Sequence, residues 1–164
     1  MSEQLVIKLL HLLEKNSRLS SSALAAMCGV SEEEIQDTLT ALESDGTIIG
    51  YHTVVNWGKV EAEPVTAMIE VKITPQRDVG FNRIAERIGN FPEVQSLYLM
   101  SGSYDLSIII QASNMQAIAD FVSYKLSTID GVQATVSHFI LKRYKDDGLL
   151  FEQHESDTRL AVTP

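Results

Sequence analysis

The sequence predicts an α+β protein in which a helix-turn-helix unit precedes a ferredoxin-like βαββαβ domain with an antiparallel sheet. Apolar side chains recur at helical spacing in residues 1–50, whereas strand-like and helix-like runs alternate in residues 65–145 in the order of a split βαβ unit. A length of 164 residues with 45% hydrophobic content suffices for two small packed domains. We place a connector strand and linker at 51–64 and a C-terminal tail at 146–164.

The first 50 residues read as three short helices. Leu5 to Glu14 has the apolar spacing of an amphipathic helix. A serine at 20–22 can cap a second helix, which Gly29 ends in a turn where a positive φ is least costly. Ser31 is predicted to cap the third helix, with Glu34 completing a capping box. The buried stripe of the third helix is predicted to be Ile35, Leu39 and Leu42.

The charge of this unit conflicts with its architecture. The second helix of a helix-turn-helix enters the DNA major groove. In this chain that is the third predicted helix, which begins with three glutamates, residues 32–34, and contains no Lys or Arg. Residues 1–50 carry three basic and eight acidic groups, a net charge of −5 within the −9 of the whole chain. Acidic groups in a first turn stabilise the helix dipole by about 0.3–1 kcal/mol each. We give this role precedence over base reading, although the two are compatible.

If the apolar stripe faces inward, the opposite face of the third helix carries Glu33, Asp37, Thr40 and Ser44, with Gln36 to one side. Gln36 could bond adenine, and Glu33 or Asp37 could accept a hydrogen bond from cytosine. The predicted DNA-contacting residues are Arg18, Ser31, Glu33, Gln36, Asp37 and Thr40. Phosphate contacts supply most of the affinity, and the cations near this unit are few: Lys8, Lys15 and Arg18, with His52 and Lys59 in the connector.

The connector and second domain follow from β-branched runs and turn residues. Thr47 to Trp57 predicts a strand or extended connector, and the turn-like stretch 58–64 marks the domain boundary. We expect strands at Val65–Thr74, Val94–Met100, Leu106–Gln111 and Val132–Tyr144, and helices at Gly80–Ile88 and Met115–Ser127. Both helices should cover one sheet face, so the other face favours dimerisation. The tail from Asp146 is polar, with an apolar patch at Leu160–Val162 that could dock on a partner subunit.

The loop between the two middle strands, Ser101 to Asp105, is a candidate ligand site. Gly102 permits close approach of the backbone, exposed backbone N–H groups can hold a carboxylate, and Asp105 can bind an ammonium group. An α-amino acid has both groups. Met100 and Tyr104 could shape an apolar part, and Thr135 and Ser137 could add polar contacts from a neighbouring subunit. The alternative is an ordinary hairpin turn, in which Ser, Gly and Asp are expected.

Several short motifs together resemble the Lrp/AsnC, or feast/famine, family of transcription regulators. They are Cys28-Gly29-Val30-Ser31, Leu42-Glu43 followed by Asp45-Gly46-Thr47-Ile48-Ile49-Gly50-Tyr51, Ser101-Gly102-Ser103-Tyr104-Asp105, and Gly131-Val132. The resemblance covers roughly residues 1–145. It implies a DNA-binding unit that acts as a dimer, a RAM-type domain that dimerises through its sheet and assembles further, commonly into an octamer, and an amino-acid effector bound between dimers near Gly102 and Asp105. Members often carry basic residues around Thr38, Thr40 and Ala41, where this chain has none.

Other chemistries find little support in the sequence. The four histidines, 11, 52, 138 and 154, are not at metal-ligand spacing, no phosphate loop or nucleophile motif is present, and we assemble no acid–base pair. We therefore expect no cofactor, no metal and no enzymatic activity. The single Cys28 fits a reducing cytoplasm, and no apolar run approaches the roughly 20 residues that span a bilayer.

The sequence thus predicts a sequence-specific, amino-acid-responsive transcription regulator that binds double-stranded DNA as a homo-oligomer. A ligand-binding oligomer whose acidic helix-turn-helix no longer contacts DNA is the alternative. A small ferredoxin-like enzyme is the third option.

Overall fold

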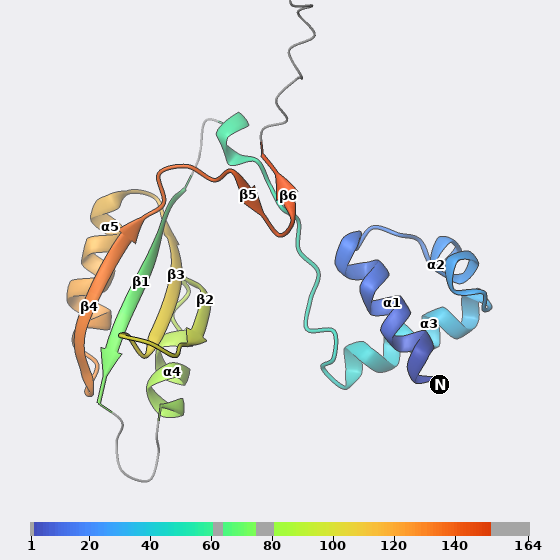
Figure 1. The fold of residues 1–164 in the computed structure, drawn as a ribbon, viewed down its shortest axis with the longest axis horizontal. Coiled ribbons are helices and arrows are strands. Elements are labelled where there is room, and N and C mark those ends of the chain that lie inside the picture. Colours follow the sequence, from blue (N-terminus) through green and yellow to red (C-terminus); the bar gives the residue numbers. More distant parts are fainter. Residues whose placement is uncertain (1, 61–63, 75–80, 152–164) are drawn as a thin grey trace, which may run out of the picture. The chain divides into compact units, whose positions relative to one another are not determined.

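The computed structural model describes residues 2–60, 64–74 and 81–151. The chain divides into two compact units, residues 1–54 and 55–164 (Figure 1). The division falls within the stretch 51–64 that the sequence marks as connector. Each unit has its own hydrophobic core, so each is described by itself.

The first unit consists of three helices, α1 (Glu3–Lys15), α2 (Ser21–Cys28) and α3 (Glu32–Ser44). Each begins at a serine whose hydroxyl accepts a backbone hydrogen bond, as the sequence predicts for α2 and α3. The core is built from one side of each helix: Leu5, Leu9, Leu13, Leu24, Ala25, Ile35 and Leu42.

The buried face of α3 differs from the prediction by one position. Thr38 is only 1% exposed, whereas Leu39 is half-buried at the edge of the core. The Thr38 hydroxyl donates to the carbonyl oxygen of Glu34 at 2.7 Å, and this bond satisfies the polar group inside the core. The stripe therefore runs through Ile35, Thr38 and Leu42, and Thr38 is not available to DNA.

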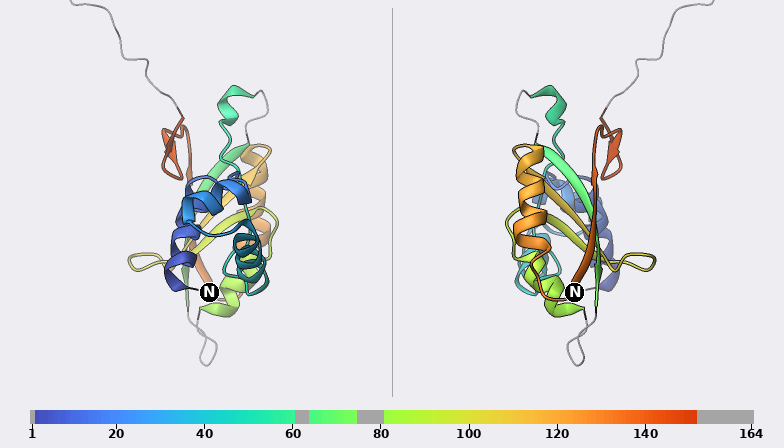
Figure 2. Two further views of the ribbon diagram at one scale, coloured as in Figure 1. Left: turned by 90° about the vertical axis from the view of Figure 1, so that its right-hand side faces the viewer. Right: turned by 90° about the vertical axis from the view of Figure 1, so that its left-hand side faces the viewer.

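The second unit has the predicted βαββαβ order. Its strands are β1 (Val65–Ile73), β2 (Val94–Leu99), β3 (Leu106–Ala112) and β4 (Val132–Phe139), and they form an antiparallel sheet of order β2-β3-β1-β4. Helix α4 (Asn82–Gly89) joins β1 to β2, and α5 (Met115–Asp120) continues as a π-helical turn, η2 (Phe121–Leu126), before β4. Figure 2 shows α5 alongside the strands.

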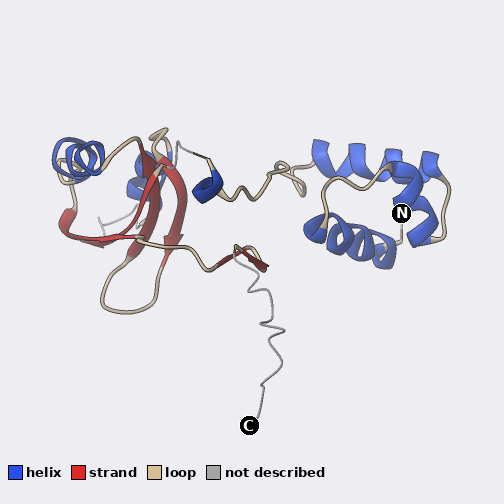
Figure 3. Ribbon diagram, turned by 90° about the horizontal axis from the view of Figure 1, so that it is seen from above, coloured by secondary structure: helices blue, strands red, loops and turns tan. Residues whose placement is uncertain are grey.

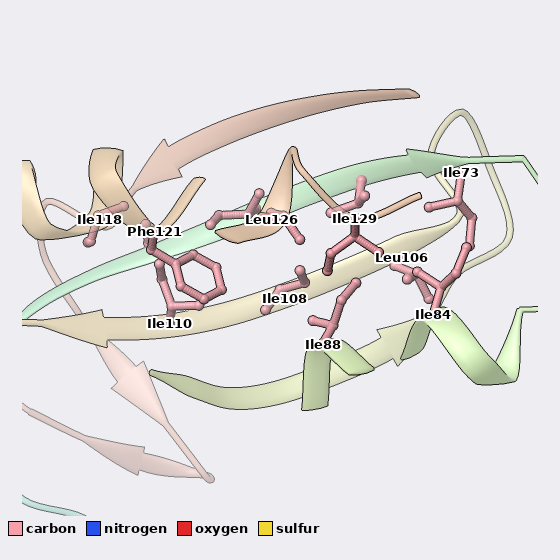
Figure 4. Close-up of a cluster of buried hydrophobic side chains, with 13 residues drawn as sticks. Ile73, Ile84, Ile88, Leu106, Ile108, Ile110, Ile118, Phe121, Leu126 and Ile129 are labelled. Atoms are coloured by element: carbon pink, nitrogen blue, oxygen red, sulfur yellow. The ribbon is translucent and has the colours of Figure 1, made fainter. Parts of the chain in front are cut away.

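Both helices cover the same side of the sheet (Figure 3). Alternate residues of β1 and β3 enter the core on that side, and Figure 4 shows them packed against Ile84, Ile88, Ile118 and Phe121. The opposite side, which we call the open face, carries Met68, Glu70 and Lys72 of β1, Ile109 of β3, Val136 and His138 of β4, and Tyr98 of β2. His138 Nε2 lies 3.1 Å from Glu70 Oε2 on this face.

Two predicted elements are wrong, and for a third the structure separates two alternatives. Residues 47–56 form no strand, which leaves the connector alternative, and a 3₁₀ turn, η1 (Trp57–Lys59), follows them. Strand β4 ends at Phe139 instead of Tyr144. Residues 146–150, predicted to begin a tail with partial order at best, form a hairpin together with Lys145, made of β5 (Lys145–Asp146) and β6 (Leu149–Leu150).

The hairpin has a local signal that the prediction overlooked. Its turn residues Asp147 and Gly148 have φ of 42° and 79°, and Asp-Gly is a preferred pair for a two-residue turn with two positive φ angles. The predicted start of the α4 helix at Gly80 and the tail patch Leu160–Val162 lie outside the described residues.

Candidate DNA-binding and effector sites

The turn between α2 and α3 is held by backbone geometry at Gly29. Its φ is 77°, in the left-handed region that glycine adopts most readily. The N–H groups of Gly29 and Val30 donate to the Ala25 carbonyl at 2.8 and 3.2 Å, which closes α2. Ser31 then starts α3 by accepting a hydrogen bond from Glu34 N at 3.1 Å. The turn therefore fixes where α3 begins and which side it presents to solvent.

Four of the predicted DNA-contacting residues lie on the exposed side of α3. Glu33, Gln36, Asp37 and Thr40 are all exposed and recur at one-turn spacing. The Thr40 hydroxyl donates to the Gln36 carbonyl at 2.8 Å. The hydroxyl oxygen of Thr40 can therefore act toward DNA only as an acceptor. Ser31, Glu33 and Asp37 share one shallow depression at the start of the helix. This surface offers mainly acceptors, and the base donors that it can meet in the major groove belong to cytosine and adenine.

The basic residues of the first unit lie outside α3. Lys8 and Lys15 are exposed on α1, and Arg18 is exposed in the turn between α1 and α2. The Arg18 backbone N–H donates to Asn16 Oδ1 at 3.0 Å, which fixes the turn while the guanidinium group faces solvent. Phosphate contacts by this unit would therefore come from α1 and its following turn.

A contact that the sequence did not suggest ties the connector to α3. The Tyr51 hydroxyl donates to Glu43 Oε1 at 2.8 Å, and Asp45 Oδ1 accepts from Thr47 N at 2.8 Å just after the helix. Partial burial raises the pKa of Tyr51, and the Glu43 carboxylate adds to this effect. Both bonds fix the path of the chain as it leaves the helix.

The loop 101–105 is anchored to the end of β1 by Asp105. Asp105 Oδ2 accepts from Ile73 N at 2.9 Å, and Oδ1 lies 3.2 Å from Lys72 Nζ. The hydrogen bond from Ile73 N, followed by the Lys72 ammonium group, holds the pKa of Asp105 below its usual range. A carboxylate offers about four acceptor positions, so Asp105 keeps acceptor capacity for a ligand. Lys72 was missed because only tertiary pairing brings it to the loop.

The other predicted effector residues divide into two groups. Gly102 has φ 146°, and Met100, which is 50% exposed, donates its N–H to the Asp105 carbonyl at 2.8 Å. Tyr104, two residues after Gly102 in the sequence, is half-buried. Thr135 and Ser137 lie opposite Val71 and Ile69 on β4, on the helix-covered side of the sheet. Within one chain they do not join the loop, whose Asp105 contacts Lys72 of the open face.

The part of the chain that the structure describes has neither a metal-binding cluster nor a membrane-spanning helix. No group of three or more His, Cys, Asp or Glu side chains among these residues is arranged to hold a metal ion. Within the same residues, no helix has the length and apolar character that crossing a bilayer requires.

Each of the two units matches the model of a known protein family. Residues 7–43 match the AsnC-type helix-turn-helix domain and residues 66–150 match the Lrp/AsnC ligand binding domain. The chain is 48% identical to the uncharacterised HTH-type transcriptional regulator YugG of Bacillus subtilis, over 96% of this chain and 95% of that protein. It is 32% identical to the HTH-type transcriptional regulator LrpA of Pyrococcus abyssi, over 84% and 94% respectively.

A solved structure with a similar fold contains a ligand. It is the complex of the transcriptional regulator NMB0573 of Neisseria meningitidis with L-Met, which superposes with a TM-score of 0.69 at 27% identity, covering 89% of this chain and 94% of that one.

Proposed function

This chain belongs to the Lrp/AsnC family of DNA-binding transcriptional regulators with a ligand-binding domain, and we propose that it reads specific DNA sequences through α3 and responds to an α-amino acid at the loop 101–105. It is a regulator and not an enzyme. The observation that carries the effector proposal is the pair of opposite charges at the loop, Lys72 and Asp105, whose Nζ and Oδ1 lie 3.2 Å apart.

The paired charges suit a zwitterion. An amino acid brings an ammonium group for Asp105 and a carboxylate for Lys72 and for the backbone N–H groups around Gly102. Met100, half exposed, offers an apolar surface for the side chain of the ligand. The L-Met complex of the Neisseria meningitidis regulator supports this ligand class. Thr135 and Ser137 would have to come from a neighbouring subunit.

The acidic α3 dictates how DNA affinity would arise. With Glu33 and Asp37 on the exposed side, one unit gains little from phosphates, and few phosphate contacts give a shallow salt dependence. Linked units in an oligomer raise the effective concentration of the second binding event. We therefore propose a homodimer, formed through the open face, that assembles into a larger oligomer such as an octamer. It would act in the cytoplasm, where its DNA is.

A second candidate function rests on the same charge. If the acidic α3 no longer contacts DNA, the protein is a ligand-binding oligomer whose helix-turn-helix serves another contact. Because amino-acid binding would be common to both functions, only DNA retention separates them.

Selection of bound sequences from random duplexes tests the proposal. The purified protein is incubated with the pool at low and moderate salt, with and without mixed amino acids, and the retained DNA is sequenced. We expect one enriched motif whose retention changes with an amino acid. Absence of enrichment at every salt concentration would sink the DNA-binding proposal and leave the second candidate. Enrichment indifferent to all amino acids would remove the effector proposal alone.

A further inference from the structure

A cavity in the second unit, remote in sequence from the loop 101–105, has the composition of a binding site. It has a volume of about 240 Å³, and its walls come from the connector at 55–59, the segment after β4 at 141–143, and Phe151 after the hairpin. The residues that matter for binding are Asn56, Trp57, Lys59, Lys142, Arg143 and Phe151. We propose that this cavity binds a small organic acid that carries an apolar group.

The charge of the lining identifies the ligand as an anion. Three of the lining side chains are cationic and none is acidic, in a chain with 22 acidic and 13 basic residues. Such a concentration of positive charge on an acidic protein raises the local concentration of anions. A neutral or cationic molecule would gain nothing from it.

Arg143 is held ready for a carboxylate. Its Nη2 donates to Thr66 Oγ1 at 2.7 Å and its Nη1 lies 3.5 Å from Asp146 Oδ2. These contacts fix the guanidinium plane, and a guanidinium has five N–H donors in all, so donors remain for a ligand. A fixed group loses less entropy on binding.

The other walls supply shape and an apolar surface. Asn56 Nδ2 donates to the Phe151 carbonyl at 3.1 Å, which joins the connector to the end of the hairpin. Figure 1 shows the β5–β6 hairpin beside this part of the chain. Trp57 and Phe151 contribute aromatic surface, and Lys142 Nζ lies 5.0 Å from the Tyr144 ring centroid. Since pockets for drug-sized ligands span about 300–1,000 Å³, this smaller cavity suits a metabolite-sized acid.

The site does not depend on the proposed amino-acid response, and its position gives a ligand a consequence. Its connector wall begins at Val55, the first residue of the second unit. A bound acid would link the connector to the segment after β4 and so restrain the chain where it enters the second unit.

Trp57 is the only tryptophan of the chain and lines the cavity, so its emission reports occupancy directly. The probes are phenylacetate, its neutral isostere phenylacetamide, and inorganic phosphate, titrated into the full-length protein. We expect phenylacetate to saturate the change in emission and phenylacetamide to bind at least about tenfold more weakly, the loss typical of a charge-assisted hydrogen bond. No saturable response to phenylacetate, or binding of phosphate alone, would overturn the proposal.

Variants locate the site. Lys59→Gln should weaken phenylacetate binding about tenfold, whereas Lys145→Gln, an equal change of charge in the nearby hairpin, should leave it unchanged. Gly102→Val should also leave it unchanged, because it alters only the loop. Equilibrium dialysis with labelled phenylacetate repeats each measurement without relying on Trp57. Loss of binding in Gly102→Val with full binding in Lys59→Gln would place the acid at the loop and refute the second site.

Discussion

Replacement of Gly131 by alanine should destabilise the second unit through one identifiable contact. Gly131 precedes β4, has φ +96°, and its carbonyl accepts from Thr74 N at 2.8 Å. A Cβ at this position would lie 2.7 Å from Ile84 Cδ1 and 3.4 Å from the Thr74 carbonyl oxygen. Ile84 is only 4% exposed, so its methyl group has little room to move.

Two terms set the magnitude. The left-handed conformation costs a residue with a Cβ about 1–2 kcal/mol, and overpacking of a core costs about 1–3 kcal/mol. We therefore expect Gly131→Ala to lower the free energy of unfolding by about 2–5 kcal/mol. Gly148→Ala is the matched control, because its φ is +79° but no heavy atom lies within 4 Å of the added Cβ. Gly148→Ala should therefore cost only the left-handed conformation, about 1–2 kcal/mol.

The overpacking term should disappear when Ile84 is shortened. Ile84→Val removes Cδ1 and alone costs about 0.5–1.5 kcal/mol. In the double variant the alanine methyl group fills the vacated space, so the double variant should be more stable than the sum of the single effects by at least about 1 kcal/mol. Urea unfolding at fixed protein concentration, followed by Trp57 fluorescence, measures the second unit, which contains this single tryptophan. Additive effects, or equal losses in Gly131→Ala and Gly148→Ala, would refute the reasoning.

Three further predictions concern the two sites. Asp37→Lys with Thr40→Arg should strengthen DNA retention and steepen its salt dependence by about 0.9 per added phosphate contact; unchanged retention on every duplex would favour the function without DNA. Thr38→Arg should lower the helicity and the melting temperature of the first unit by placing an unpaired charge in its core, whereas Thr40→Arg alone should leave the circular dichroism unchanged; equal effects would contradict the buried position of Thr38. Because the folded pKa of Asp105 is depressed, its stabilising effect is present above its unfolded pKa of about 3.9 and is lost as the pH falls through the folded pKa. The difference in urea midpoint between wild type and Asp105→Asn should therefore shrink on acidification, and a difference that is constant with pH would show that the carboxylate charge plays no part.

Local patterns in the sequence determined the elements and their order. The serine caps of α2 and α3, the glycine turn at residue 29 and the alternation of β1 depend on neighbours within a few residues. For this reason the three helices and the βαββαβ order could be predicted. The Asp147-Gly148 turn is equally local, so the β5–β6 hairpin was predictable from the sequence as well.

Contacts between distant residues decided the rest. The pairing of Lys72 with Asp105 spans 33 residues, and the bond from Asn56 to Phe151 spans 95. No periodicity encodes such partners, because they depend on strand register and on the path of the connector within the second unit. The same holds for Thr38, whose burial over Leu39 was set by the rotation of α3 against α1 and α2.

The sequence by itself therefore determined a helix-turn-helix followed by a split βαβ sheet, with an acidic third helix and a glycine loop as candidate sites. Only the tertiary structure decided that Lys72 stands beside the loop, that Thr135 and Ser137 lie on the other side of the sheet within one chain, and that three cations line one cavity. The physical reason is that periodicity fixes which side of an element is buried, whereas packing fixes which side chains meet.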